Sequence, residues 1–328
     1  MTDLHVGAKS NSQTHLNDCE EFVDWFIATA QSQGCETGIF SGDWNHNRNT
    51  INLVTLDTSI RLLEKLGAGF KQFFWFPGNH DCFFRDRRDV HSSIFGKHIP
   101  GVTIIDTIHT QGDVTLVPWL IGDEWKNISK VKSRYMFGHF ELPLFYMNAQ
   151  VQMPDHGALQ ANHFQHQEYV FSGHFHKRQN QGKIWYIGNA FPHNFSDAWD
   201  DERGMMVLEW GGKPQFINWP DAPKYRTVTL SELIDQKDTI LKSKMYLKVQ
   251  LDIDISFEEA NFIKETFLKE HDIREMSLIQ ENNNIDGALD DGIGIKFESV
   301  DQLVSEELLK IESEIYDNAV LLDLYNNL

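Results

Sequence analysis

An α/β fold with a largely parallel sheet, a second sheet packed on it and a small additional domain is the architecture that the sequence predicts. Helical and strand-like patterns alternate up to Phe76, and this strand–helix–strand order is typical of a parallel sheet. Strand candidates then follow one another as far as Trp219 with few helices between them, which predicts the second sheet. The 328 residues, 41% of them hydrophobic, allow one large domain and one small one.

Two amphipathic helices and two short strands account for the first part of the chain. The first helix is predicted from about Asn17 to Gln33, and the second ends with Gly67 as its expected C-cap. The apolar runs Thr37–Phe40 and Phe70–Phe76 predict strands, and each run stops at a polar segment that contains glycine. The helices' apolar faces comprise Phe22, Val23, Phe26, Ile27 and Ala30 in the first and Leu56, Ile60, Leu63 and Leu66 in the second.

Further strands complete the first domain, which we expect to span residues 1–222. These segments are 102–106, 114–120, 134–137, 168–172, 184–187, 205–210 and 215–219.

A small β-α-β module is predicted at residues 230–280. Tyr246–Ile255 alternates like a strand, Ser256 and Glu259 form a capping box for a helix, and Ile273–Ile279 is a candidate returning strand. Residues 281–300, rich in Asn, Asp and Gly, are expected to be a linker. Residues 301–328 are predicted to form a helical tail with an apolar stripe. This tail either packs on its own domain or docks a partner.

Composition limits the class of protein. The net charge of −19 argues against an extensive nucleic-acid-binding surface, since phosphate contacts need Lys and Arg, although many acidic residues lie in the last quarter of the chain. The three cysteines are scattered, without the spacing of a zinc site. There is no apolar run of about 18 residues, and the start lacks the pattern of a secretion signal. We therefore expect a cytoplasmic protein without a membrane span.

Polar, ligand-type residues recur at or just after predicted strand ends. In Gly173-His-Phe-His176, the two histidines are two residues apart and face one side of a strand, unless the glycine lets the backbone turn. Because the carboxyl ends of parallel strands meet at one edge of a sheet, we expect such segments to converge. The other four are Asp3-Leu-His5, Gly42-Asp43-Trp-Asn-His46, Gly78-Asn-His-Asp81 and Gly138-His139.

This inventory of imidazole, carboxylate and amide groups predicts a metal site. The mixture suits Mn²⁺, Fe²⁺ or Zn²⁺, and the number of ligands favours two ions about 3.5–4 Å apart that share one carboxylate. Such a pair can neutralise a phosphodiester and lower the pKa of an attacking water, while a histidine outside the ligand set protonates the leaving oxygen.

In this order, the five motifs resemble those of the calcineurin-like metallophosphoesterase superfamily. More narrowly, the chain resembles the SbcD-type nucleases of DNA double-strand-break repair, including their phage counterparts. Gly-His-Phe-Glu at 138–141, Tyr-Ile-Gly-Asn-Ala-Phe-Pro at 186–192 and Asp-Asp-Glu-Arg-Gly at 200–204 support the narrower match, which covers roughly residues 1–220. The resemblance implies a four-layer α-β-β-α sandwich, with the later module similar to that family's capping domain.

The resemblance also assigns roles to matching residues. It implies that Asp43 bridges two divalent ions, with Mn²⁺ favoured and Mg²⁺, Fe²⁺ or Zn²⁺ as alternatives. Asp3, His5 and His176 would hold one ion, and Asn79, His139 and His174 the other. His80 matches the catalytic histidine, His46 an auxiliary histidine, and Asp81 is expected to orient His80.

Residues outside the motifs are assigned more loosely. Arg85, Arg87 and Arg88 either form a solvated charge run or contact DNA phosphates. Four further histidines near the motifs are candidates for lining the cleft or contacting phosphates: His156, His163, His166 and His193.

The implied activity is double-strand exonuclease and single-strand endonuclease cleavage of DNA, within a recombination and repair complex. The implied partners are DNA, an SbcC-type coiled-coil ATPase and a second copy of the chain. The compartment would be the cytoplasm of a bacterium, or of the host cell if the protein is phage-encoded.

The chain departs from the family at its start. An apolar strand usually precedes Asp-x-His, but only Met1 and Thr2 precede Asp3 here. We expect a misplaced start; loss of the strand, the alternative, would weaken the anchoring of Asp3 and His5.

Two other functions stay open at this stage. One is a phosphodiesterase or phosphatase acting on a small molecule or phosphoprotein. Against the phosphoprotein case, Asp-Arg-Gly does not follow the Gly-Asp motif, and the third motif ends in Asp rather than Glu. The other is a non-catalytic scaffold that tethers the ATPase, which the intact His80 and the complete ligand set disfavour.

Overall fold

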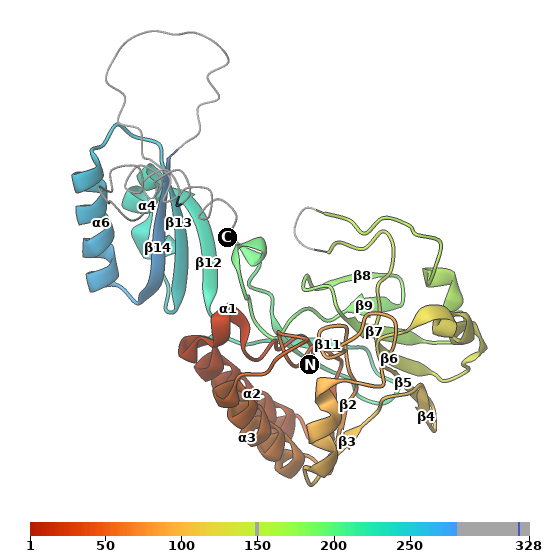
Figure 1. Cartoon of the computed structure of the whole chain (residues 1–328). Helices are drawn as coiled ribbons and strands as arrows, with labels where there is room; N and C mark the ends of the chain where they lie inside the picture. The colour runs from red at the N-terminus through yellow and green to blue at the C-terminus, as the bar shows by residue number, and fades with distance from the viewer. Residues whose placement is uncertain (148–150, 281–320, 322–328) are drawn as a thin grey trace.

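The computed structural model describes residues 1–147, 151–280 and 321. It is a mixed α/β structure with a larger unit that contains α1–α3 and β1–β11, and a smaller unit that contains β12–β14 and α4–α6 (Figure 1). The linker predicted at 281–300 and the tail predicted at 301–328 lie outside the described residues, apart from Leu321. In the described ranges, no helix combines the length and apolar character needed to cross a membrane.

The first sheet contains three parallel strands, in the order β1 (Thr37–Phe40), β2 (Gln72–Trp75) and β3 (Val102–Ile104). Successive side chains of a strand face opposite sides. Accordingly, Phe73 and Trp75 join the core formed with the helices, whereas Phe74 lies in the core between the sheets. The predicted strands at these positions are therefore confirmed.

Helices α2 (Gln13–Ser32) and α3 (Leu53–Gly69) lie side by side against this sheet (Figure 1). Both predicted helices are confirmed, although α2 begins four residues earlier than expected. The prediction of Gly67 as a C-cap is wrong, because α3 continues to Gly69. Gly67 instead permits close packing, since a Cβ atom there would lie 2.1 Å from the carbonyl oxygen of Pro100.

The second sheet contains six strands in the order β4-β5-β6-β7-β9-β8. Strands β5, β6, β7 and β9 are parallel to one another, whereas the edge strands β4 and β8 are antiparallel to their neighbours. The bounds are β4 His109–Gln111, β5 Val114–Val117, β6 Tyr135–His139, β7 Tyr169–Gly173, β8 Gln179–Gln181 and β9 Ile184–Tyr186. The sequence analysis missed β4 and β8 because both are short and polar. Each joins its neighbour through a tight turn in which a glycine, Gly112 or Gly182, has positive φ.

The observed structure differs from the expected four-layer α-β-β-α sandwich in its outermost layer, beside the second sheet. The outer face of the second sheet is covered by the 3-10 helix η2 (Gly122–Lys130) and by irregular chain with side chains such as Leu142, Phe145 and Phe164. Among the described residues of 140–164, the only helical turn is η3 (Ala161–His163). Pro143 and Pro154 each remove a backbone donor and oppose a continuous α-helix here.

The remaining elements of the larger unit are short. Strands β10 (Gly204–Val207) and β11 (Gln215–Asn218) form an antiparallel hairpin. Both strands were predicted, with slightly greater lengths, but their pairing was not. The others are α1 (Ala8–Asn11), η1 (Ser92–His98) and η4 (Phe195–Asp197).

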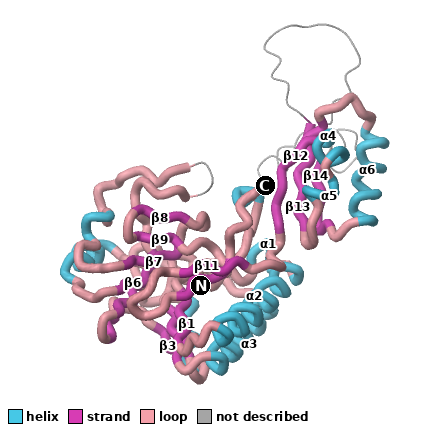
Figure 2. Tube along the Cα trace, turned by 180° about the vertical axis from the view of Figure 1, so that it is seen from behind, coloured by secondary structure: helices cyan, strands magenta, loops and turns pink. Residues whose placement is uncertain are grey.

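The smaller unit is a three-stranded parallel sheet of β12 (Lys224–Thr229), β13 (Met245–Leu251) and β14 (Ile273–Gln280). Its helices lie beside the strands (Figure 2): α4 (Leu230–Asp235), α5 (Lys237–Ile240) and α6 (Phe257–Glu270). The capping box of Ser256 and Glu259 is confirmed at the start of α6. Strand β12 was not predicted. Because it begins at Lys224, the smaller unit starts before residue 230, the predicted boundary. Arg274 of β14 pairs with the buried Asp18 of α2 through contacts of 2.6 and 2.8 Å, which joins the two units.

A cavity of about 350 Å³ lies between the two sheets of the larger unit. Its wall includes Met1, Phe74, Phe137 and Met205, which are apolar. The lining includes Ser41, which precedes Gly42, but no residue of the five histidine- and aspartate-containing motifs. The cavity is therefore separate from the polar cluster described next.

Candidate metal centre

All seven predicted metal ligands lie close together, and five of them are at or just after the ends of parallel strands. Asp43 follows β1, Asn79 follows β2, His139 ends β6, and His174 and His176 follow β7. Asp3 and His5 come from the segment before α1. This segment runs along the β1 end, where Asp3 N–H donates to Gly42 and His5 N–H donates to Asp43, at 3.0 and 3.1 Å. Asp3 and His5 are 0% and 3% exposed, so the weaker anchoring that the alternative of a lost strand implied is not observed.

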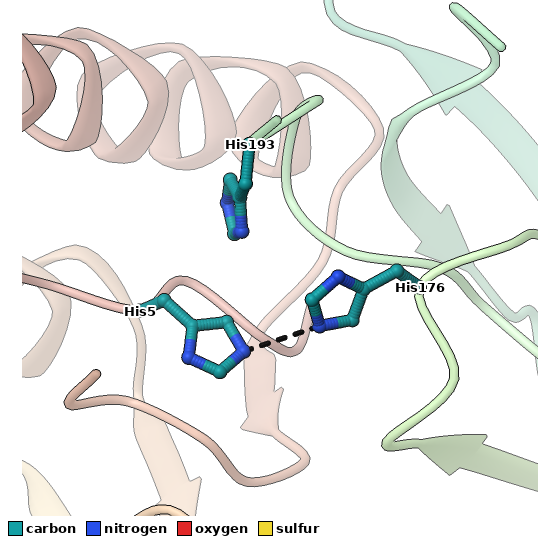
Figure 3. A group of neighbouring side chains, drawn as sticks. All are labelled: His5, His176 and His193. Carbon is teal, nitrogen blue, oxygen red and sulfur yellow. Dashed lines mark hydrogen bonds between the residues drawn. The ribbon is translucent and has the colours of Figure 1, made fainter. Parts of the chain in front are cut away.

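One cluster contains Asp3, His5, His176 and Asp43. The Nε2 atoms of His5 and His176 lie 3.2 Å apart and face each other (Figure 3). Asp3 Oδ1 lies 3.9 Å from the first nitrogen and 3.8 Å from the second, and Asp43 Oδ2 lies 3.8 Å from His5 Nε2. Two imidazole nitrogens and two carboxylates therefore converge on one point.

The second cluster contains Asn79, His139, His174 and again Asp43. Asn79 Oδ1 lies 3.0 Å from His139 Nε2 and 2.9 Å from His174 Nδ1. Asp43 Oδ2 is 3.4 Å from His139 Nε2. Because Asp43 belongs to both clusters, its carboxylate is placed to bridge two cations.

The outer nitrogens of the second cluster have partners that orient the inner ones. His139 Nδ1 lies 2.7 Å from the carbonyl oxygen of Ser41, and His174 Nε2 lies 3.3 Å from Glu141 Oε2. Each contact favours a proton on the outer nitrogen and directs the inner nitrogen at Asn79 and Asp43. A rotated Asn79 amide would donate to His174 Nδ1 at 2.9 Å and accept from Arg48 Nη2 at 2.9 Å.

The electrostatics of Asp43 and His139 favour a positive charge between them. Burial alone would raise the pKa of Asp43, but the facing His139 holds it well below its usual value. Burial also lowers the pKa of His139, yet Asp43 overcomes this and raises it to about 9. A proton on His139 therefore compensates the buried carboxylate in the free protein, and a metal ion would displace that proton.

Four of the proposed ligands have a strained backbone conformation. Asp3, His5, Asp43 and His174 have φ values of 52°, 50°, 60° and 89°, a region that non-glycine residues rarely occupy. Such conformations cost about 1–3 kcal/mol each and are typical of functional sites. Gly78 is required beside them, because a Cβ atom there would lie 2.3 Å from Asp43 Oδ1.

Asp81 has a different role from the one expected. Its buried carboxylate accepts hydrogen bonds from the backbone N–H groups of Gly78, Asp43, Trp44 and Asn45 at 2.9–3.1 Å. Among the described residues, no hydrogen bond joins it to the His80 ring. The ring of His80 is instead oriented by the carbonyl oxygen of His46, 2.8 Å from His80 Nδ1. The expectation that Asp81 orients His80 is corrected: Asp81 fixes the loop that presents Asp43.

His80 and His46 lie at the exposed side of the cluster. Their rings are stacked with centroids 5.9 Å apart, and the His80 ring lies 4.9 Å from that of His5. The backbone N–H of His80 donates to Asp43 Oδ1 at 2.7 Å. Both histidines are therefore near the candidate metal positions and open to a substrate.

The three arginines that were predicted as candidate DNA-phosphate contacts differ in their exposure to solvent. Arg88 is turned inward, with its side chain 8% exposed, and forms a two-point ion pair with Glu124 at 2.9 Å. It is therefore occupied in the fold, and the prediction of a DNA-phosphate contact is corrected for this residue. Arg87 is exposed, lies over the Phe84 ring and pairs with Asp89, and Arg85 is also exposed.

Sequence reasoning missed Glu141 and Arg48, and it did not separate His193 from three other histidines. His156 and His166 are exposed, and His163 contacts the backbone of Gln160, whereas His193 reaches the first cluster. Glu141 lies in the quoted Gly-His-Phe-Glu segment, two residues after a ligand, and that spacing could have indicated its role.

Changing Glu141 to Gln is expected to weaken the binding of Mn²⁺ by about 10- to 100-fold, because the carboxylate that orients His174 is lost. Isothermal titration with Mn²⁺ after chelator treatment measures the effect. Glu168→Gln is the matched control, since Glu168 pairs with Arg134 away from the cluster. Equal affinity in both variants would show that Glu141 does not support the site.

Comparisons with known proteins show a sequence relative of this chain. No family model matches the chain. The chain is 23% identical over 333 aligned residues to "Exonuclease subunit 1" of Enterobacteria phage T4, and the match covers 97% of this chain and 93% of that protein. The similarity therefore spans both units of the structure.

Among solved structures, the chain is similar to the nuclease MPE of Pseudomonas putida. The alignment covers 56% of this chain and 64% of that one, less than two thirds of its length, with 18% identity and a TM-score of 0.29. A TM-score of this size supports no conclusion about the fold.

Proposed function

We propose that this chain is a metal-dependent DNA nuclease of the SbcD type that hydrolyses phosphodiester bonds at a centre for two divalent cations. One observation carries the proposal: two clusters of ligand atoms from five distant segments share the carboxylate of Asp43. The similarity to a phage exonuclease subunit over almost the whole chain supports the choice of DNA as substrate.

The donor set fits the proposed ions. Four imidazoles, two carboxylates and one amide oxygen, without a thiolate, suit Mn²⁺ or Fe²⁺ better than a purely oxygen-seeking ion. When bound, the pair would supply charge neutralisation for the phosphodiester and a water of lowered pKa. The chain's own part is to hold that geometry through Asp81, Glu141 and the strained ligand loops.

His80 and His46 are the groups proposed to act on the substrate. Neither contributes a ring nitrogen to the two clusters, and both are accessible from solvent. The ring of His80 is held by the His46 carbonyl through Nδ1, which leaves Nε2 to hold a proton for the leaving oxygen. His46, stacked beside it, would position the phosphate.

The complex and its architecture are part of the proposal. A relative described as a subunit supports action with a partner, for which we propose an SbcC-type coiled-coil ATPase. We propose residues 1–222 as the nuclease domain and the unit of β12–β14 as the capping domain. Arg85 and Arg87 remain the proposed DNA-phosphate contacts, and a homodimer is the proposed assembly.

Cleavage assays test the proposal. The purified chain is treated with EDTA, reloaded with Mn²⁺ and incubated with circular single-stranded DNA, linear duplex DNA and bis(p-nitrophenyl) phosphate. We expect cleavage of DNA that depends on Mn²⁺ and is absent in the Asp43→Asn variant, which excludes a contaminating nuclease.

The substrates separate the alternatives. Hydrolysis of bis(p-nitrophenyl) phosphate without cleavage of either DNA would favour a small-molecule phosphodiesterase. Two bound Mn²⁺ ions without hydrolysis of any substrate, in the presence and absence of the ATPase partner, would favour a scaffold.

A further inference from the structure

His193 is a buried histidine at the first cluster that the proposed ligand set does not use. It is 6% exposed, and its Nε2 atom has no hydrogen-bond partner in the part of the chain that the structure describes. Its ring points toward the gap between His5 and His176 (Figure 3), and one nitrogen from each of the three rings lies within 4.8 Å of the others.

The backbone of His193 is held by contacts of both its N–H and its carbonyl group. The N–H of His193 donates to Asp197 Oδ2 at 2.9 Å, and its carbonyl oxygen accepts from the Tyr225 hydroxyl at 2.8 Å. Asp197 in turn lies 3.5 Å from the guanidinium of Arg203, which is 1% exposed. The backbone that carries the ring is therefore anchored inside the fold.

Aromatic and imidazole rings surround the Nε2 atom of His193, and none of the described residues forms a hydrogen bond with it. The ring packs edge-on against Phe191, His15 and His5, with centroids 5.0, 5.5 and 5.4 Å away. A buried polar atom without a partner is unfavourable and uncommon, so it calls for a group that is absent from the polypeptide. The two carboxylates of the first cluster make that group a cation.

We propose that His193 is a third imidazole ligand of the first metal position, together with Asp3, His5, His176 and the shared Asp43. This inference rests on the proposed two-cation centre. It makes the two positions unequal: the first has three imidazoles and two carboxylates, and the second has two imidazoles, one amide and one carboxylate. Because imidazole favours transition metals over Mg²⁺, the first position is the one expected to retain Mn²⁺ or Fe²⁺ at low metal concentration.

The test is the His193→Phe variant, which keeps a ring against Phe191 and removes both nitrogens. Titration of the chelator-treated protein with Mn²⁺, followed by electron paramagnetic resonance, measures the tighter of the two binding steps. We expect this step to weaken by about 10-fold or more while the weaker step changes little. His109→Phe is the matched control, because His109 is exposed on the edge strand β4.

Pulsed paramagnetic resonance gives a readout that does not depend on a variant of His193. In protein labelled with ¹⁵N-histidine and carrying His139→Asn to disable the second position, three imidazoles should couple to the single Mn²⁺ ion. Two coupled imidazoles would overturn the inference, even if His193→Phe failed to fold.

The outcomes also separate this inference from the proposed function. If the wild type binds two Mn²⁺ ions and His193→Phe binds them with unchanged affinity, the role of His193 is refuted and the two-cation centre stands. If the wild type binds no Mn²⁺, both proposals are refuted.

Discussion

Replacing Asp43 with asparagine is expected to reduce the Mn²⁺ content from two ions per chain to less than one and to lower DNA cleavage by at least about 10³-fold. The carboxylate contributes to both clusters, with Oδ2 3.8 Å from His5 Nε2 and 3.4 Å from His139 Nε2. An amide of the same shape carries no charge and cannot bridge two cations. Loss of both ions removes several kcal/mol of transition-state stabilisation, and each 1.36 kcal/mol corresponds to about a tenfold change in rate.

Metal analysis by plasma mass spectrometry and cleavage of circular single-stranded DNA measure the two effects on the same preparation. Asp123→Asn is the matched control, because Asp123 is exposed in η2 and pairs only with Lys126 among the described contacts. A thermal melt shows whether the Asp43 variant is folded. Two ions per chain in a folded Asp43→Asn protein would contradict a bridging role.

The positions of the proposed ligands could be predicted from the sequence because of two local features. Five of the seven lie within a few residues of the end of an apolar run, whereas Asp3 and His5 do not. All seven have a glycine or a second proposed ligand close by, as in Gly138-His139 and Gly173-His-Phe-His176. Parallel strands then place these ends together, which is a property of the fold rather than of any single residue. The same reasoning identified the helices, the central strands and the position of His80.

What the sequence did not reveal depends on contacts between distant segments. Asp81 stands next to His80 in the chain, but its carboxylate turns to the backbone of residues 43–45, which no spacing indicates. Arg88 follows Arg87 and has the same charge, yet Glu124 draws it into the fold. His193 gains its position from Asp197 and Tyr225, and neither motif nor periodicity relates these residues to the first cluster.

Changing His80 to Gln is expected to lower cleavage by about 10²- to 10⁴-fold while the protein still binds two Mn²⁺ ions, because general acid catalysis contributes that much and His80 is outside both ligand sets. The Nδ1 atom of His80 contacts the His46 carbonyl oxygen, so only Nε2 can serve the substrate. Cleavage rates and metal content, measured on the same sample, test both halves of the expectation. His109→Gln controls for the loss of a histidine elsewhere.

The leaving group gives a sharper test of the role of His80. A p-nitrophenolate departs without protonation, so the defect of His80→Gln should be much smaller with thymidine 5′-(p-nitrophenyl phosphate) than with DNA. One nitrogen from each of His5, His46 and His80 also lies within 4.8 Å of the others, which allows a competing arrangement in which His80 binds metal. In that arrangement the variant would lose metal and would be equally defective on both substrates. If the variant keeps both Mn²⁺ ions and its defect is smaller with the p-nitrophenyl substrate, His80 acts in proton transfer. If the variant loses metal and is equally defective on both substrates, His80 is a metal ligand.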